Sequence, residues 1–560
     1  MQLNGAQILI QTLIEQGVTD VFGYPGGQVI NIYDALYEYK DKINHVLTAH
    51  EQGAAHAADG YSRSTGKVGV CIATSGPGAT NLVTGIATAM LDSIPMVAIT
   101  GNVPCSLIGK DSFQEIDITG VTLPITKHNF FVSKIEDLAD TIREAFSIAK
   151  SGRPGPVLVD IPKDVQVGKY EYQPQPVVEK IPLPKVKEDL IEQAVAMIAE
   201  AKKPYIYVGG GAAGLGLGDE IVEFAEKIDA AIGCSFMGLS SVPQDNEKFL
   251  GMQGMHGHYA SSMSQNEADL ILAVGVRFSD RATGNVSKFA KQSKIIQLDP
   301  DSAEVNKNVR VNLGLVGDVE DSFKRIAAAC AESKKPEWMA RVKALKQEER
   351  TIAEEIEAAA QAPLTPKAVF DIINELKPAK TITATDVGQH QMWAAQYSTF
   401  DGPRRIVSSG GLGTMGFGLG AAIGAYVATK DPVILITGDG SFGMNLNELA
   451  TAVTYKIPVV IVLMNNGVLG MVRQWQTLFF GKRYSSTVLS RKTDFVALAK
   501  AFGADGYLAE TAVEFRKAFD SALKANKVSV IDVRIDKDEL VLPMLPPGGA
   551  ISDIITKIEK

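Results

Sequence analysis

Two apolar runs, 433–437 and 457–464, constrain the fold of this 560-residue chain more than any other feature. Their length and aliphatic composition are typical of parallel strands that are buried on both faces. The segment between them, from Met444 to Tyr455, is expected to form a helix that packs on the same sheet. The stretch therefore predicts a strand–turn–helix–strand unit of an α/β fold.

Polar residues follow both predicted strands. Gly438-Asp439-Gly440 ends the first, and Asn465-Asn466 ends the second after the 24 residues 441–464. Ligands of parallel sheets bind beyond the carboxyl ends of the strands, where glycines let the backbone approach closely and a helix N-terminus favours phosphate. Asp439 and Asn466 also offer the hard oxygen ligands that Mg²⁺ prefers. We expect a Mg²⁺–diphosphate site, although Gly-Asp-Gly alone is equally common in plain turns.

This spacing resembles the signature of thiamine diphosphate (ThDP) enzymes of the pyruvate-decarboxylase-like family. The resemblance implies that Asp439, Asn466 and the carbonyl of Val468 hold the metal. A second motif is the segment Gly410-Gly411-Leu412-Gly413-Thr414-Met415-Gly416. Here the resemblance implies that Met415 bends the cofactor and that the Gly413 carbonyl accepts a hydrogen bond from the cofactor's 4′-amino group. The alternative is a glycine-rich turn with a core methionine. Further implied ThDP contacts are Gln389, His390, Gly438, Gly440, Ser441 and Met471. Taken alone, His390 is equally well explained as a structural hydrogen bonder.

Glu51 is the second candidate group. The segment 46–51 is expected to be a strand that ends in this carboxylate, and the alternative is a charge at a helix N-terminus. The resemblance gives Glu51 the task of promoting proton loss from ThDP through the ring nitrogen N1′. It also implies that Glu51 and Asp439 of one active site come from different subunits, so that the active unit is a dimer.

Composition excludes several classes of protein. The net charge of −9 argues against nucleic acid as the main partner. The four cysteines are scattered, which is typical of reduced core residues in a cytoplasmic protein rather than of a disulfide or zinc framework. We expect no signal peptide, and no apolar run reaches the length of a membrane span.

The chain alternates predicted strands and helices, so we expect three α/β domains with mainly parallel sheets. The predicted domains span 1–170, 188–335 and 365–536, followed by a C-terminal tail over 537–560. A proline-rich linker (170–187) and a connecting helix (337–362) separate them. Residues 87–97 match 450–460, and the same offset pairs 74–77 with 437–440. The first and third domains are therefore predicted to be copies of one fold, with chance similarity as the alternative.

Further motifs are similar to those of biosynthetic acetohydroxyacid (acetolactate) synthase catalytic subunits, over nearly the whole chain. They include Phe113-Gln114-Glu115, Arg153-Pro154-Gly155-Pro156, Met255-His256-Gly257 and the segments 277–281 and 470–476. The similarity implies ThDP-dependent decarboxylation of pyruvate and transfer of the two-carbon unit to a second 2-ketoacid. Pyruvate as acceptor gives 2-acetolactate and 2-ketobutyrate gives 2-aceto-2-hydroxybutyrate, in branched-chain amino-acid biosynthesis. Arg281 is expected to clamp the acceptor carboxylate and Trp475 to contact its alkyl group. Phe113, Gln114, Lys163 and Met471 resemble the other pocket residues.

The middle domain resembles the FAD-binding domain of that family. The matching positions are Arg153, Gly209, Gly210, Gly211, Met255, His256, Gly257, Arg277, Asp299 and Asp318. The reaction has no net redox change, so FAD is expected to be structural. The resemblance also implies a homodimer or tetramer and a separate small regulatory subunit. The alternatives are a FAD-free catabolic acetolactate synthase and a pyruvate oxidase. Glyoxylate carboligase is disfavoured because it lacks the activating glutamate, and a non-catalytic relative is expected to have lost Glu51 or a metal ligand.

Overall fold

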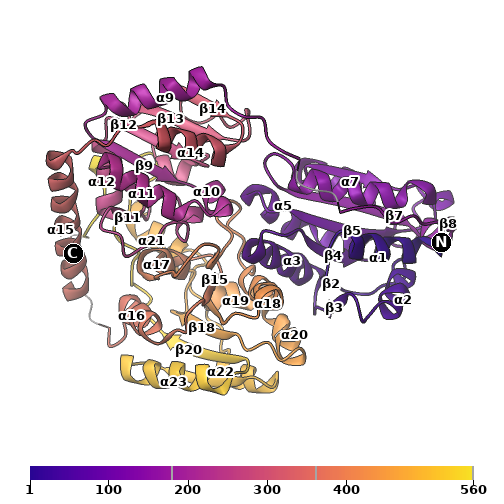
Figure 1. Cartoon of the computed structure of the whole chain (residues 1–560). Coiled ribbons are helices and arrows are strands. Elements are labelled where there is room, and N and C mark those ends of the chain that lie inside the picture. The colour runs from indigo at the N-terminus through magenta and orange to yellow at the C-terminus, as the bar shows by residue number, and fades with distance from the viewer. Residues whose placement is uncertain (178–180, 360–361, 558–560) are drawn as a thin grey trace.

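The chain folds around three six-stranded parallel sheets, each covered by helices (Figure 1). The computed structural model describes residues 1–177, 181–359 and 362–557. The predicted α/β class with mainly parallel sheets is confirmed. Among the described residues, no helix is both long and apolar enough to cross a membrane.

The N-terminal sheet has the strand order β3-β2-β4-β5-β7-β6. Its strands are β2 (Asp20–Gly23), β3 (Asn44–Leu47), β4 (Gly69–Ala73), β5 (Met96–Asn102), β6 (His128–Phe131) and β7 (Pro156–Pro162). The helices that position the site are α3 (Glu51–Thr65), α4 (Pro77–Asn81) and α5 (Val83–Asp92). The prediction of a strand over 46–51 was wrong beyond Leu47. The imidazole of His50 accepts from the backbone N–H of Gln52 and caps α3, so Glu51 is the first residue of a helix.

The C-terminal sheet has the order β16-β15-β17-β18-β20-β19. Its strands are β15 (Ile382–Thr385), β16 (Ile406–Val407), β17 (Val433–Gly438), β18 (Val460–Asn465), β19 (Asp505–Ala509) and β20 (Ser529–Arg534). Taken in chain order, these strands occupy the same places as those of the first sheet. The internal repeat predicted this shared topology.

The helix predicted between β17 and β18 is broken and begins earlier. It consists of α19 (Asp439–Asn445), a 3₁₀ turn (Leu446–Glu448) and α20 (Leu449–Thr454). Asn445 leaves helical geometry at φ −142°, and its side chain donates to the Gly416 carbonyl at 3.2 Å. This hydrogen bond ties the end of α19 to the segment that precedes Gly418.

The middle sheet has the order β11-β10-β9-β12-β13-β14. Its strands are β9 (Pro204–Val208), β10 (Ala231–Cys234), β11 (Phe249–Met252), β12 (Leu270–Val274), β13 (Lys294–Asp299) and β14 (Leu313–Val316). The order reverses between β9 and β12. Sheets of this kind bind ligands beyond the carboxyl ends of the strands at such a reversal.

The connecting segments differ in part from expectation. The predicted linker over 170–187 starts within β8 (Lys169–Glu171), which pairs antiparallel with β1 (Gln2–Asn4), and residues 178–180 lie outside the described ranges. The connecting helix is α15 (Pro336–Ala359), and 360–361 of its prediction are likewise not described. In the tail, the Leu545 N–H donates to the Met255 carbonyl at 2.7 Å, so this segment packs on the middle domain.

Helices α3 and α18 (Gly418–Thr429), which are related by the internal repeat, pack on each other and join the N-terminal and C-terminal domains. Both use glycine where they cross. A Cβ atom on Gly60 would overlap the Ala421 carbonyl oxygen, and one on Gly424 would overlap that of Ala57. The backbones therefore touch directly, which fixes how the N-terminal domain sits on the C-terminal one.

Candidate active site

Asp439 and Asn466 lie at the carboxyl ends of neighbouring strands. Asp439 follows β17 directly and Asn466 follows β18, and these two strands are paired. The Asn466 Oδ1 atom accepts from the Val468 N–H at 3.2 Å, while its Nδ2 atom donates to Gln389 Oε1 at 3.1 Å. Gly467 makes the turn at φ +67°. Asp439 and Asn466, the two side chains predicted to bind the metal, therefore lie at the same edge of the sheet.

The carboxyl of Asp439 lies in a setting suited to a cation. Burial raises its pKa to about 6, although the N–H groups of Gly440 and Gly467 favour the ionised form. No group of three or more His, Cys, Asp or Glu side chains that could hold a metal occurs among the described residues. One carboxylate, one amide and a backbone carbonyl remain as donors, a set that suits Mg²⁺ when phosphate oxygens and water complete it.

His390 provides a buried nitrogen beside the same strand end. It lies on α17 (Gln389–Tyr397), and a Cβ atom on Gly438 would be 2.8 Å from its Nδ1 atom. Burial lowers the pKa of the His390 imidazole to about 3, so the ring is neutral. Its Nε2 atom is buried with no hydrogen-bond partner among the described residues. A buried polar atom of this kind normally has a partner, so it fits a site that binds a polar ligand.

The loop 410–415 faces this edge of the sheet. Gly413 adopts φ +70°, and no atom lies closer than 3.9 Å to a Cβ placed there. Met415 reaches towards Gly440, since its Cε atom would lie 3.6 Å from a Cβ on that glycine. Ser441 donates to the Val387 carbonyl at 2.8 Å, so its hydroxyl anchors the start of α19.

Asp386 supports this loop, and the sequence reasoning missed it. Its carboxylate accepts from the N–H groups of Gly416 (2.8 Å) and Gly418 (3.2 Å) and from the Thr437 hydroxyl (2.9 Å). Burial raises the pKa of Asp386 to about 6, and these donors oppose the shift. The available signal was an acidic residue directly after the buried strand β15, where a lone carboxylate needs hydrogen-bond partners.

Three models of thiamine pyrophosphate enzymes match the chain: the N-terminal TPP-binding domain at 3–121, the central domain at 191–326 and the C-terminal TPP-binding domain at 386–533. Thiamine pyrophosphate is another name for ThDP. The acetolactate synthase isozyme 2 large subunit of Escherichia coli is 45% identical, with 99% of this chain and 100% of the relative covered. The probable acetolactate synthase large subunit of Methanocaldococcus jannaschii is 44% identical, with 99% and 96% covered. The acetolactate synthase large subunit of Corynebacterium glutamicum is also 44% identical, with 99% of this chain and 90% of the relative covered.

The chain belongs to the acetolactate synthase large-subunit family.

In this member of the acetolactate synthase family, Glu51 begins α3 in the N-terminal domain. Its Oε2 atom accepts from Asn81 Nδ2 at 3.0 Å, at the end of α4. No hydrogen bond or ion pair between described residues joins Glu51 to Gly413, Asp439 or Asn466. Within one chain, no direct polar contact between described residues therefore links the two halves of the predicted site.

The predicted substrate residues form three separate groups. Trp475 and Met471 lie on α21 (Gly470–Phe479) and border a largely apolar hollow. The hollow is also lined by Val472, Gln476, Phe480, Arg483 and Ser485. Arg281, in the middle domain, has a 64% exposed side chain paired with Asp280 at 3.1 Å. In the N-terminal domain, Phe113 is 84% exposed beside Gln114, and Lys163 donates to the Gly27 carbonyl at 3.2 Å.

Several of the predicted flavin residues meet at the reversal of the middle sheet. Gly209 and Gly211 follow β9 and pack against Gly275 after β12, where a Cβ on Gly209 would overlap the Gly275 carbonyl oxygen. Gly210 begins the short helix α10 (Gly210–Leu215). The backbones at this point are in direct contact, as close packing of a glycine-rich turn requires.

Charged residues of the predicted flavin-binding set lie beside this glycine-rich turn. Arg153 donates to Glu304 at 2.5 Å and to Ser93 at 2.7 Å. Burial lowers the pKa of Arg277, and the neighbouring Arg153 lowers it further. Burial raises the pKa of Asp299 to about 6. The sequence reasoning missed Glu304, which partners Arg153 from the loop after β13.

The other predicted flavin residues have local roles in this structure. The Met255 N–H donates to the Arg281 carbonyl at 2.8 Å, and Gly257 closes the same turn through the Gly254 carbonyl at 3.0 Å. Burial lowers the pKa of His256 to about 4, and its Nδ1 atom has no partner among the described residues. Asp318 caps α14 (Val319–Ala329) by accepting from the Asp321 N–H at 3.1 Å.

Proposed function

We propose that this chain is the catalytic subunit of a biosynthetic acetolactate synthase. It decarboxylates pyruvate and transfers the acetaldehyde unit to a second 2-ketoacid, which yields 2-acetolactate or 2-aceto-2-hydroxybutyrate. The observation that carries the proposal is the pair of ligand positions, Asp439 and Asn466, at adjacent strand ends beside the buried His390. Similarity to acetolactate synthase large subunits over the full length supports it.

When bound, ThDP would supply the nucleophilic carbon and the electron sink that decarboxylation of pyruvate needs. Asp439, Asn466 and the Val468 carbonyl would hold Mg²⁺. The N–H groups around Gly438 and Gly440, at the start of α19, favour the negative diphosphate. Gln389, His390 and Ser441 would complete its contacts. Because the Asp439 carboxyl is buried, a bound cation would compensate the cost of its charge.

Proton transfer at the cofactor ring falls to Glu51. Its carboxylate, held by Asn81 at 3.0 Å, would exchange a proton with the ring nitrogen N1′. The resemblance to the family implies that Glu51 and Asp439 of one active site come from different subunits, so we place Glu51 in the active site of a partner subunit. The exposed Phe113 of the same domain would then be covered on assembly. The proposed active unit is a homodimer, or a tetramer built from it.

The acceptor ketoacid would meet residues from all three domains. Arg281, whose guanidinium is exposed, would bind the carboxylate in a bidentate manner. Trp475 and Met471 would contact the alkyl group from the hollow on α21. Phe113, Gln114 and Lys163 would close the pocket from the N-terminal domain of the partner.

We further propose a non-redox FAD at the reversal of the middle sheet, held by the flavin residues described above. The partly buried Arg277 and the buried His256 offer groups for it, and the His256 Nδ1 atom has no hydrogen-bond partner among the described residues. A separate small regulatory subunit is proposed because the relatives are named as large subunits. We place the enzyme in the cytoplasm, since its four cysteines are free thiols.

Product formation from pyruvate tests the proposal. The purified chain is incubated with ThDP, Mg²⁺ and FAD, and each is omitted in turn. Acetolactate that requires all three supports the biosynthetic assignment. Acetolactate formed equally well without FAD indicates the catabolic alternative, and acetate formed with consumption of oxygen indicates a pyruvate oxidase. Absence of any product from pyruvate refutes the proposal.

A further inference from the structure

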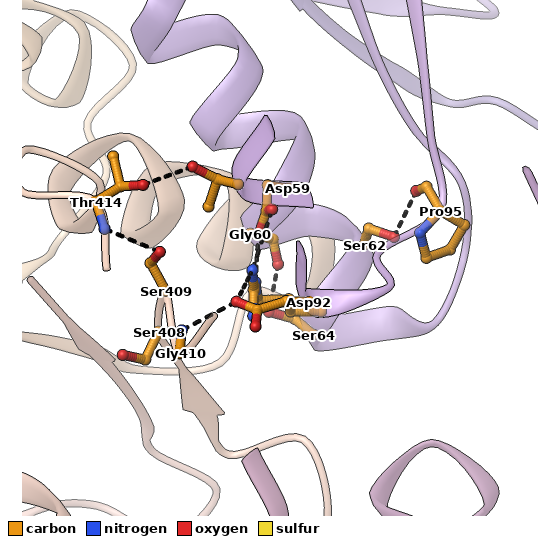
Figure 2. Close-up of polar contacts among 12 residues, drawn as sticks. Asp59, Gly60, Ser62, Ser64, Asp92, Pro95, Ser408, Ser409, Gly410 and Thr414 are labelled. Carbon is orange, nitrogen blue, oxygen red and sulfur yellow. Dashed lines mark hydrogen bonds and ion pairs between the residues drawn. The ribbon is translucent and has the colours of Figure 1, made fainter. Parts of the chain in front are cut away.

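The end of α5 contacts both ends of the loop 410–414. Thr88 and Asp92 are four residues apart and therefore share one face of this helix. The Thr88 hydroxyl lies 2.7 Å from that of Thr414. The Asp92 Oδ2 atom accepts from the Gly410 N–H at 3.0 Å (Figure 2). Two side chains of the N-terminal domain thus hold a loop of the C-terminal domain.

Asp92 is a fixed acceptor rather than a mobile surface group. Its side chain is fully buried, and Arg63 Nη2 donates to the same Oδ2 atom at 2.9 Å. Arg63 also pairs with Asp59, four residues earlier on α3. Burial raises the pKa of Asp59, while the Arg63 charge opposes that shift. Hydrogen-bonded buried charges of this kind allow few alternative geometries.

The loop is fastened at its ends and open in its middle. The Ser409 hydroxyl accepts from the Thr414 N–H at 3.1 Å, and Ser408 at the base bonds to Thr385 and Gln391. Gly411 packs so tightly that a Cβ there would lie 2.9 Å from Asp92 Oδ1. Around Gly413, in contrast, a Cβ would meet no atom closer than 3.9 Å.

We propose that Thr88 and Asp92 are positioning residues for thiamine diphosphate. They hold the ends of the loop, so that the Gly413 carbonyl and Met415 are already positioned where the proposed function places the cofactor ring. The inference rests on that proposed function. A loop with glycines at 410, 411 and 413 loses much conformational entropy on ordering, at roughly 1–2 kcal/mol per residue. A loop already held in the free protein spares cofactor binding this cost.

Amide hydrogen exchange of the cofactor-free protein is the first readout, because it does not depend on activity. In D92A, we expect the Gly410 amide to exchange about tenfold faster or more, since it loses its acceptor. T88V removes one hydroxyl without removing a charge, and we expect a smaller increase over 411–414. D92N keeps an acceptor oxygen for the Gly410 N–H and should largely restore protection. E15Q is the matched control: it removes the buried partner of Arg143 in the same domain, far from the loop.

Calorimetric titration with thiamine diphosphate and Mg²⁺ is the second readout. We expect about tenfold weaker cofactor binding in D92A, weaker binding in T88V, near-normal binding in D92N and no change in E15Q. The KM for pyruvate should stay near the wild-type value when the cofactor is saturating. If D92A does not fold, T88V decides the question alone.

A purely structural contact predicts a different result. In that case D92A and T88V lose stability as E15Q does, but loop exchange and cofactor affinity stay at wild-type values, and the inference is overturned. A wild-type chain that does not bind thiamine diphosphate refutes the proposed function and this assignment together. Normal wild-type binding with unchanged binding by D92A and T88V refutes the assignment alone.

Discussion

Glu448→Gln tests whether the C-terminal domain positions Glu51. The Glu448 carboxylate is fully buried in the 3₁₀ turn before α20. It accepts from the backbone N–H groups of Ala49 (3.1 Å) and His50 (3.0 Å) and from the Thr451 hydroxyl (2.6 Å). The first two donors immediately precede Glu51, so this carboxylate holds the start of α3.

The expected loss of stability in E448Q follows from the hydrogen bonds that the Glu448 carboxylate accepts. Glutamine has the same shape but only one oxygen, so its NH₂ group must face one of the two backbone N–H groups. The amide cannot turn away, because Gly53 packs directly against it. One lost charge-assisted hydrogen bond and one unsatisfied N–H together cost about 2–4 kcal/mol. The shift of the α3 N-terminus should also displace Glu51.

Two assays with one control decide the outcome. Urea unfolding should show a lower midpoint for E448Q, and acetolactate formation at saturating ThDP should fall at least about tenfold in kcat. E375Q is the control in the same domain, since Glu375 pairs with Arg516 on the surface, where an ion pair contributes little to stability. If E448Q is as stable and as active as E375Q, Glu448 does not position Glu51.

Three shorter predictions concern packing, pH and specificity. G424A should lower the free energy of unfolding by about 1–3 kcal/mol in chemical unfolding, because its added methyl group would overlap the Ala57 carbonyl. G214A is the control and should not lower it, since a methyl group there would meet only the Arg404 guanidinium at 3.6 Å. Equal effects of the two substitutions would contradict the close crossing of α3 and α18. Burial acts to raise the pKa of Glu15, but hydrogen bonds from Arg143 and others lower it to about 2, below its unfolded value of 4.5. The contribution of ionised Glu15 to the stability of the fold is therefore complete above about pH 5 and is lost as the pH falls towards 2. The difference in the free energy of unfolding between wild type and E15Q should shrink over that pH range. A constant difference would argue against the ion pair. W475A should reduce the preference for 2-ketobutyrate over pyruvate by about tenfold in a competition assay, and an unchanged product ratio would remove Trp475 from the acceptor pocket.

Local sequence patterns predicted the centre of this fold well. The apolar runs 433–437 and 457–464 predicted β17 and β18, because parallel strands that are buried on both faces need continuous apolar side chains. Neighbouring parallel strands end at the same edge, so Asp439 and Asn466 were expected to meet there, as they do. The internal repeat predicted a shared topology because two βαβ units of equal spacing build the same sheet.

Contacts between domains were beyond the reach of the sequence. Asp92 and Glu448 each hold backbone N–H groups of another domain, across hundreds of residues, and no local pattern indicates such partners. The strand predicted over 46–51 failed for a similar reason, since the His50 cap and the Glu448 carboxylate favour a helix from Glu51. The role of Glu51 came from family resemblance, and its hydrogen bond with Asn81 became visible only in three dimensions.

Subunit complementation tests the central claim most directly. E51Q and D439A are each expected to form inactive dimers. When the two are unfolded, mixed in equal amounts and refolded together, half of the dimers are expected to be mixed, and each mixed dimer has one site with both native groups. The account predicts recovery to about a quarter of wild-type acetolactate formation, since that site combines Glu51 of one chain with Asp439 of the other. No recovery, with mixed dimers shown to be present, would contradict an active site shared between subunits.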